Sequence, residues 1–329
     1  MTQLGRLPAF GIRAAAAAVS GIPGARRLAV LTYHRVPDVP DAMLPDEPDA
    51  SVFDRQMAVL KRCFRVIPLV LAVEQLRRGA LPARAVCVTF DDGYADNVDV
   101  ALPILQKWDI PATFFIATGF LSGGMMWNDR IIESLRRCAL PRLDLRSLGL
   151  GQHDLTAQHK VGSLKSLLDE LKYRPFSQRQ KLVDAVVEQT GVDLPSRLMM
   201  SHDQVRKLYD GGMEVGAHTV NHPILAALTD REAEQEITES RRELEGITGG
   251  VVRTFAYPNG RPGTDYNMSH VDAVRDAGFE VAVSTAWGSA RMDSDPLQLP
   301  RVTGWGADAW KFGARVAKSF LDGPAKRAM

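Results

Sequence analysis

Two adjacent carboxylates end a short apolar segment of the chain, in the stretch "VTFDDGYADN" at residues 88–97. Asp91 and Asp92 carry like charges that repel each other and resist burial, so some other interaction has to favour their placement. A turn is one explanation, because Asp-Gly is a common turn dipeptide and every strand has to end. A bound cation is the other explanation, because its charge would offset the repulsion.

Two histidines four residues apart could supply further ligands for such a cation. His218 and His222 lie in "HTVNH", and this spacing would place both imidazoles on one face of a helical turn. Chance often produces this spacing, so it is informative only together with Asp91 and Asp92. One carboxylate and two imidazoles leave positions open for water and substrate, as a catalytic zinc-type site requires. The other carboxylate is then free to act as a base toward water activated by the ion.

The segments around these residues predict an α/β protein. Short apolar runs without alternation recur, as is typical of parallel strands that are buried on both faces. We expect strands at residues 28–33, 85–90, 112–117, 213–218, 253–258, 280–285 and 297–302. Helical segments lie between them, and two begin at capping boxes formed by Thr229 with Glu232 and by Ser201 with Gln204. About seven such units predict a distorted (β/α)7 TIM-like barrel with its chemistry at the carboxyl ends of the strands.

The chain divides into three parts in this interpretation. Residues 28–305 form the barrel, and residues 306–329 form a C-terminal helix or tail. Between about 128 and 200 polar helical segments replace the strands, which we interpret as a helical insertion within the barrel domain. Residues 1–27 contain a short alanine-rich run after two arginines. An amphipathic helix that touches a membrane surface is one reading of this segment, and a secretory signal is the alternative.

Composition narrows the class of protein and its compartment. The 329 residues are 45% hydrophobic and 24% charged, and the net charge is +1 with scattered Lys and Arg, which argues against a nucleic-acid partner. The three cysteines, Cys63, Cys87 and Cys138, cannot all pair and show no metal-ligand spacing. We therefore expect a cytoplasmic protein, with membrane association through the N-terminal segment or secretion as alternatives.

Three motifs together indicate a family. "TFDDG", "HTVNH" and "FAYPNG", in this order, resemble the polysaccharide deacetylase domain of carbohydrate esterase family 4, also called the NodB homology domain. The resemblance covers about residues 28–305, and the first two motifs together are highly specific. It implies an enzyme that removes acetyl groups from N-acetylated amino sugars of a poly- or oligosaccharide. It also implies one divalent metal ion, Zn²⁺ in the first place, with Co²⁺, Ni²⁺ or Mn²⁺ as alternatives.

The resemblance assigns roles to the matching residues of the first motifs. Asp91 matches the catalytic base of the family, and its metal triad is matched by Asp92, His218 and His222.

Further roles follow from the third and fourth motifs. In "FAYPNG", Asn259 matches the residue whose backbone N–H helps to hold the oxyanion, and Tyr257 and Pro258 precede it in the substrate-binding motif. The segment "WGSARMDSDPLQLPRV" lies where the fourth motif is expected, with Asp295 and Arg301 as counterparts.

Two departures from the family pattern matter for the mechanism. Many members carry an arginine that orients the catalytic aspartate where this chain has Ala256, and Arg301 is our candidate substitute. The usual C-terminal histidine that supplies the general acid is also missing, since no histidine follows His270. Exopolysaccharide-type members look circularly permuted, with an equivalent histidine on the first strand, and His34 in "TYHRV" matches it. A capped surface histidine beside Pro37 is the alternative for His34.

The sequence also suggests roles for one tryptophan and for the remaining histidines. "MMWNDRI" resembles a segment of exopolysaccharide enzymes, so Trp127 is expected to stack on a sugar ring, with simple packing as the alternative. The other histidines are expected at the surface: His153, His159, His202 and His270.

Two rival functions remain open at this point. The first is a deacylase of a lipid-linked amino sugar or of another non-peptide amide. The second is an inactive sugar-binding homologue, although such a protein would need neither a base nor a metal triad.

Overall fold

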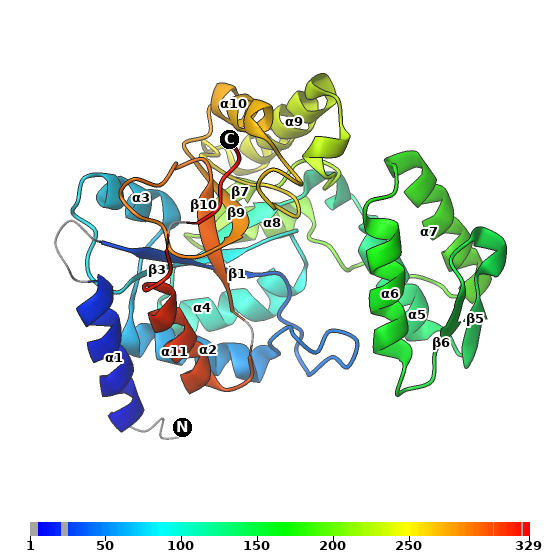
Figure 1. Ribbon diagram of the computed structural model, residues 1–329, viewed down its shortest axis with the longest axis horizontal. Helices are drawn as coiled ribbons and strands as arrows, with labels where there is room; N and C mark the ends of the chain where they lie inside the picture. The colour runs from blue at the N-terminus through cyan, green and yellow to red at the C-terminus, as the bar shows by residue number, and fades with distance from the viewer. Residues whose placement is uncertain (1–5, 21–25, 305, 324) are drawn as a thin grey trace. The chain divides into compact units, whose positions relative to one another are not determined.

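Parallel strands form a closed ring in the larger part of the chain, and helices surround them (Figure 1). The structure is a computed structural model that describes residues 6–20, 26–304, 306–323 and 325–329. Within these residues seven strands pair in the order β1-β10-β9-β8-β7-β4-β3, and β3 pairs again with β1. Their bounds are β1 Leu28–Tyr33, β3 Ala85–Phe90, β4 Thr113–Ile116, β7 Glu214–Ala217, β8 Thr254–Ala256, β9 Val281–Trp287 and β10 Leu299–Thr303. The short strand β2 (Arg65–Val66) pairs with the beginning of β3. The expected TIM-like barrel and its strands are confirmed, with small differences at the strand ends.

The barrel strands are apolar because both of their faces are buried. Every residue of β1 and β3 is buried. Alternate residues of each strand face opposite sides, so Leu28 and Val30 pack in one apolar cluster with α3 (Leu69–Arg77), whereas Leu31 packs in another cluster with the outer helices. The start of α3 is fixed by Glu214, whose carboxylate accepts a hydrogen bond from the Leu69 N–H at 2.9 Å.

Helices cover the outside of the barrel. Their bounds are α1 Arg6–Ser20, α2 Ala50–Cys63, α4 Leu102–Trp108, α8 His202–Asp210, α9 Asp230–Thr248, α10 Met268–Asp276 and α11 Ala309–Ser319. Both expected capping boxes are present, at Ser201 for α8 and at Thr229 for α9. Residue 305, where we placed the end of the barrel, lies outside the described residues.

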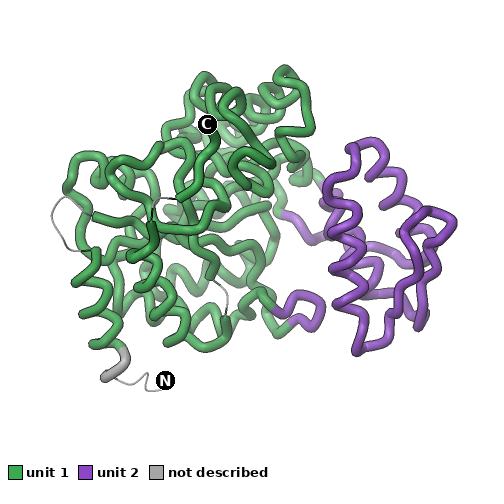
Figure 2. The backbone as a smooth tube through the Cα atoms, viewed as in Figure 1, with its two compact units in different colours: residues 1–40, 46–122, 200–329 green, residues 41–45, 123–199 purple. Residues whose placement is uncertain are grey.

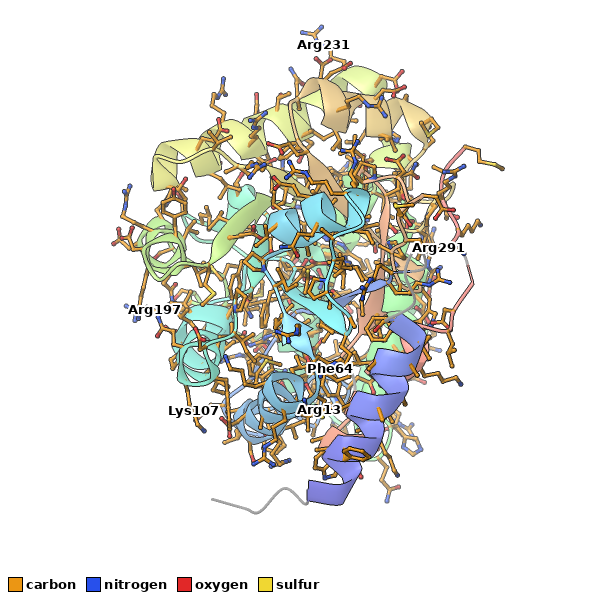
Figure 3. The ribbon with its side chains drawn as sticks, turned by 90° about the vertical axis from the view of Figure 1, so that its left-hand side faces the viewer. Arg13, Phe64, Lys107, Arg197, Arg231 and Arg291 are labelled. Carbon is orange, nitrogen blue, oxygen red and sulfur yellow. The ribbon has the colours of Figure 1, made fainter. Side chains whose placement is uncertain are left out.

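The N-terminal helix α1 packs against α2 and α11 through Ile12 and Ala16. Figure 3 shows α1 from its own side of the molecule, with the exposed Arg13 labelled on it. Residues 1–5 and 21–25 of the expected N-terminal segment lie outside the described residues. In the described part of the chain, every helix is too short or too polar to cross a membrane. Contact of this segment with a membrane surface stays a prediction.

Residues 41–45 and 123–199 cluster as a second compact unit, which we call the helical unit (Figure 2). The other residues form the barrel unit. The helical unit contains α5 Trp127–Arg137, α6 Lys160–Lys172, α7 Phe176–Thr190 and an antiparallel hairpin of β5 Arg142–Asp144 with β6 Gln152–Asp154. Its core is separate from that of the barrel and includes Ile131, Leu167 and Val183. The hairpin was not expected, because each of its strands buries only its central residue.

Two of the four histidines that we expected at the surface are buried, so that expectation was wrong for them. His153 is the buried residue of β6, and its Nε2 lies 2.8 Å from the Leu150 carbonyl oxygen. His270 is buried at the start of α10, where its Nδ1 accepts a hydrogen bond from the Asn267 N–H. Both imidazoles therefore satisfy neighbouring backbone groups, a role that the sequence pattern does not show.

Candidate metal and catalytic site

The side chains expected to bind metal meet at the carboxyl ends of two strands. Asp92 follows β3, and His218 and His222 follow β7. The Oδ1 atom of Asp92 lies 3.4 Å from Nε2 of His218 and 3.4 Å from Nε2 of His222. All three atoms lie within 4.8 Å of one another. Ligands about 2.0–2.1 Å from a tetrahedral ion are about 3.3 Å apart, so this donor set fits a divalent cation.

The protonation of these side chains also suits a cation. Nδ1 of His218 lies 2.7 Å from the Ala256 carbonyl oxygen, a contact that places the proton on Nδ1 and leaves the Nε2 lone pair free. Burial lowers the pKa of His222 to about 4, so its imidazole is neutral near pH 7. Burial alone would raise the pKa of Asp92, but His218 and His222 outweigh it and keep that pKa below its usual range.

Residues 218–222 do not form the helical turn that we expected from the i, i+4 spacing. Thr219 and His222 both adopt left-handed backbone conformations, with φ of 66° and 52°. The Thr219 hydroxyl accepts a hydrogen bond from the His222 N–H at 3.1 Å. A tight reversal of the chain, rather than helical periodicity, therefore brings the two imidazoles together. Asp92 is also left-handed (φ 78°), and strained residues of this kind cluster at functional sites.

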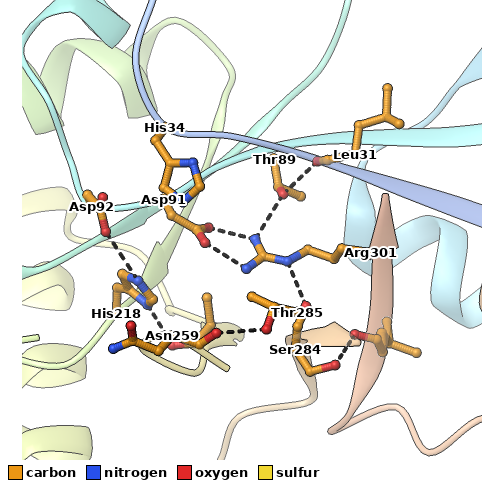
Figure 4. A network of polar contacts seen from close by, with 12 residues as sticks. Leu31, His34, Thr89, Asp91, Asp92, His218, Asn259, Ser284, Thr285 and Arg301 are labelled. Atoms are coloured by element: carbon orange, nitrogen blue, oxygen red, sulfur yellow. Dashed lines mark hydrogen bonds and ion pairs between the residues drawn. The ribbon is translucent and has the colours of Figure 1, made fainter. Parts of the chain in front are cut away.

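The expected base, Asp91, is held by Arg301 inside the barrel unit (Figure 4). Nη1 and Nη2 of Arg301 donate to Oδ1 and Oδ2 of Asp91 at 2.7 and 2.6 Å, and both side chains are buried. The Nε of Arg301 donates to the Ser284 carbonyl at 2.9 Å, which fixes the plane of the guanidinium. Burial acts to raise the pKa of Asp91, but Arg301 outweighs it and lowers that pKa. This contact supports Arg301 as the substitute for the arginine missing at Ala256, which remains a prediction.

Asn259 lies in the same network and offers a backbone donor. Its φ is 57°, and its carbonyl accepts a hydrogen bond from the Thr285 hydroxyl at 2.7 Å (Figure 4). Among the described residues, no acceptor is found for the Asn259 N–H. The preceding Pro258 is buried, and its carbonyl accepts from the Gly260 N–H, which tightens the turn. The N–H of Asn259 is therefore available to a ligand.

Two other side chains expected to bind substrate have different partners. Tyr257 is fully buried, stacks on Tyr266 with ring centroids 3.9 Å apart, and donates to the Leu297 carbonyl at 3.0 Å. Asp295 accepts hydrogen bonds from the Leu297 N–H and from Nε2 of Gln298 at 2.9 and 3.0 Å. Tyr257 thus belongs to the core and Asp295 caps a turn before β10, and a contact of either side chain with substrate stays a prediction.

His34, the expected general acid, follows β1 and lies on the same side of the network as Asp91 and Asp92 (Figure 4). Its side chain is 38% exposed, and its Nδ1 lies 3.9 Å from Oε1 of Glu47. Burial acts to lower the pKa of His34, but the carboxylates of Asp92, Glu47 and Asp91 outweigh it, and the pKa is raised. Sequence reasoning missed Glu47, because it is one of several acids in a polar segment without a diagnostic spacing.

Trp127 begins α5 and belongs to the helical unit. The Arg179 guanidinium lies over its ring, 4.9 Å from the centroid. The stacking of Trp127 on a sugar ring stays a prediction. The contact with Arg179 supports the alternative, in which Trp127 only packs against its neighbours.

Comparison with known proteins defines the class. The family model for polysaccharide deacetylases matches residues 78–139 and 174–282. The chain belongs to the polysaccharide deacetylase family.

Two curated relatives resemble parts of the chain. The protein YxkH of Bacillus subtilis, named for the same family, is 21% identical over 234 residues, which are 71% of this chain and 56% of YxkH. The poly-β-1,6-N-acetyl-D-glucosamine N-deacetylase of Staphylococcus epidermidis is 28% identical over 95 residues, 29% of this chain and 33% of that protein. The matched regions thus span about half and a third of these two relatives.

Solved structures show the same fold. IcaB from Ammonifex degensii superimposes with a TM-score of 0.57 at 20% identity, covering 89% of this chain and 97% of IcaB. The deacetylase PplD of Streptococcus pyogenes superimposes with a TM-score of 0.56 at 20% identity, covering 84% and 92%.

Proposed function

We propose that the chain is a metal-dependent hydrolase that removes acetyl groups from N-acetylated amino sugars of a poly- or oligosaccharide. One observation carries this proposal: the buried, arginine-held carboxylate of Asp91 lies beside the donor set of Asp92, His218 and His222. A base next to an open three-ligand site is what water-dependent cleavage of an amide requires. The Staphylococcus relative, named for an N-acetylglucosamine polymer, supports this substrate class.

Asp92, His218 and His222 would hold the ion. A divalent cation there, with Zn²⁺ as the first candidate and Co²⁺, Ni²⁺ or Mn²⁺ as alternatives, would supply Lewis acidity toward the acetamide carbonyl and toward water.

Asp91 takes the proton of the attacking water. Because Arg301 lowers its pKa, Asp91 is ionised near neutral pH and can accept that proton, while the two hydrogen bonds from Arg301 keep its oxygens in place. The water oxygen forms a bond to the carbonyl carbon. The N–H of Asn259 then donates a hydrogen bond to the oxyanion that develops.

His34 completes the reaction. An amine leaves far more readily when it is protonated, and His34, which lies beside the carboxylate of Glu47, gives a proton to the nitrogen as the C–N bond breaks. Acetate and a free amino sugar are the products.

Acetate release from N-acetylglucosamine oligosaccharides and from an acetylated exopolysaccharide tests the proposal. We expect release that stops with a chelator and returns with Zn²⁺. Release of the acyl group only from a lipid-linked amino sugar or another amide would instead support the alternative function, a deacylase of such compounds. Saturable binding of sugars without any release would favour the inactive homologue.

A further inference from the structure

Glu47 places a carboxylate beside the imidazole of His34. Its Oε1 lies 3.9 Å from Nδ1, and its side chain is only 17% exposed. Its other oxygen, Oε2, accepts a hydrogen bond from the Arg35 N–H at 3.4 Å. Glu47 lies outside both segments that match the family model. We propose that Glu47 is a positioning residue, which orients His34 through Nδ1 so that Nε2 delivers the proton in the reaction proposed above.

The main chain around His34 is already fixed by other residues. Nδ2 of Asn97 donates to the His34 carbonyl at 2.8 Å. The next residue, Arg35, donates from Nε to Oδ2 of Asp96 at 2.9 Å, and Asp96 also accepts from the Val36 N–H at 3.3 Å. The orientation of the His34 ring therefore depends on its own torsions and on the charges that face it.

Several charged groups of the described residues act on the His34 ring, and the nearby imidazole of His222 interacts with it as well. The carboxylates of Asp92, Glu47 and Asp91 favour the imidazolium, and Arg301 opposes it. Asp91 is already bound by Arg301 through both oxygens, and Asp92 belongs to the donor set for a cation. A cation there would itself disfavour a charged His34.

Glu47 is thus the carboxylate of this group that is committed neither to Arg301 nor to the donor set. The nearby Asp96, which also acts on Glu47, forms an ion pair with Arg35. The distance of 3.9 Å between Glu47 and His34 is that of an ion pair and exceeds a direct hydrogen bond. A carboxylate beside Nδ1 of His34 favours a proton on that nitrogen. The proton that His34 gives to the leaving amine is then the one on Nε2.

The main test replaces Glu47 by Gln, which keeps size and removes the charge. We expect kcat for acetate release to fall about 10- to 100-fold, the usual effect of losing a partner that orients a reacting group, with KM nearly unchanged. The high-pH limb of the rate profile should move to lower pH, because the imidazolium loses its stabilising carboxylate. Glu47→Asp should restore part of kcat. Asp46→Asn, which removes the same charge from the exposed preceding residue, should behave as wild type.

A second readout does not depend on turnover. Titration of the His34 ring nitrogens by NMR in the Zn²⁺-loaded protein, assigned with His34→Ala, should show a lower pKa in Glu47→Gln and an unchanged pKa in Asp46→Asn. An unchanged His34 titration in Glu47→Gln would overturn the proposal, and so would a lowered pKa with an unaltered kcat. If the wild-type protein releases no acetate from any substrate, the proposed function fails, and the NMR titration still decides whether Glu47 acts on His34.

Discussion

At the level of single residues, the buried ion pair of Asp91 and Arg301 connects the end of β3 to β10. Removing two charges from water is costly, and the cost is offset here by a bidentate contact and by the hydrogen bond from Arg301 to the Ser284 carbonyl. The same contact keeps Asp91 ionised. Mutation of each residue tests the two functions of the pair, which are fixing the carboxylate and lowering its pKa.

Asp91→Asn should strongly slow acetate release while metal content stays that of wild type. The amide keeps the shape of the carboxylate but cannot accept the proton, and loss of one general base costs roughly 100- to 10,000-fold. The variant should also be less stable, because the Arg301 charge stays buried without its partner. Kinetics, metal analysis and thermal unfolding of the same preparation measure the three effects. Loss of the metal would show that the roles of Asp91 and Asp92 are reversed.

Arg301→Lys should move the acidic limb of the kcat/KM profile to higher pH. Lysine keeps the charge but loses the bidentate contact, so the pKa of Asp91 rises toward its ordinary value and the base is protonated at a higher pH. Loss of one charged hydrogen bond costs about 1.5–3 kcal/mol, which is about ten- to a hundredfold in kcat/KM. A pH–rate profile of both proteins is the measurement. An unshifted acidic limb would contradict a role of Arg301 in setting this pKa.

His218→Ala and His222→Ala should each lower the bound divalent metal of the purified protein. Each change removes one of three ligands, and the two remaining ligands bind an ion far more weakly. His202→Ala is the matched control, because its ring contacts Glu243 and lies outside the donor set. Elemental analysis after dialysis gives the answer. Wild-type metal content in both ligand variants would refute the assignment.

The residue types of the donor set could be predicted from the sequence, whereas several contacts could not. Asp92, His218 and His222 were recognisable because local motifs carry them. The contact of Glu47 with His34 was not predictable, because the path of a loop brings the two residues together and no sequence spacing indicates it. The packing of Tyr257 was not predictable either: its motif lies beside the site, but its ring packs in the core.

At the level of elements, the strands were predictable and the reversal after β7 was not. Continuous apolar runs directly reflect burial on both faces, so β1 and β3 follow from local sequence. The reversal that contains the left-handed residues Thr219 and His222 instead contacts a distant segment, the short 3-10 helix Thr118–Phe120. There the Gly119 N–H donates to the Val220 carbonyl at 2.8 Å, and a Cβ on Gly119 would approach that oxygen to 2.8 Å.

Gly216→Ala should destabilise the barrel and disturb the site. A Cβ at this position of β7 would overlap Oγ1 of Thr254 and lie 2.6 Å from Cδ1 of Phe115, and such overpacking costs about 1–3 kcal/mol. Gly246→Ala, in α9 with open space around its Cβ, should instead stabilise by about 0.5–1 kcal/mol. Thermal or denaturant unfolding compares the two variants. Equal stability of both would show that β7 can move to accept the methyl group.

At the level of the whole molecule, the chain consists of two compact units with separate cores. The donor set, Asp91, Arg301 and His34 all belong to the barrel unit. Local sequence predicted the helices of the helical unit but not its separate core. A core is defined by contacts between segments, such as α5 with α7, which helical periodicity does not reveal.

Hydrogen exchange should therefore respond to metal removal in one unit only. With a chelator we expect faster exchange in peptides that cover residues 88–97 and 214–222, because the ion would connect these two segments. Peptides of α6 and α7 should exchange at unchanged rates. Mass spectrometry with and without chelator makes the comparison. Equal acceleration in α6 and α7 would mean that the metal stabilises both units together.

The contact between Asp91 and Arg301 also sets an order of events during synthesis of the chain. The two residues are 210 positions apart, and β1 lies between their strands, paired with both β3 and β10. A nascent chain that ends before β10 has an open sheet edge at β1, and its Asp91 lacks the guanidinium that holds its two oxygens in place. Barrel closure and the fixed orientation of Asp91 thus arrive together, with the last strand, so we expect no acetate release from a ribosome-bound chain that ends before β10.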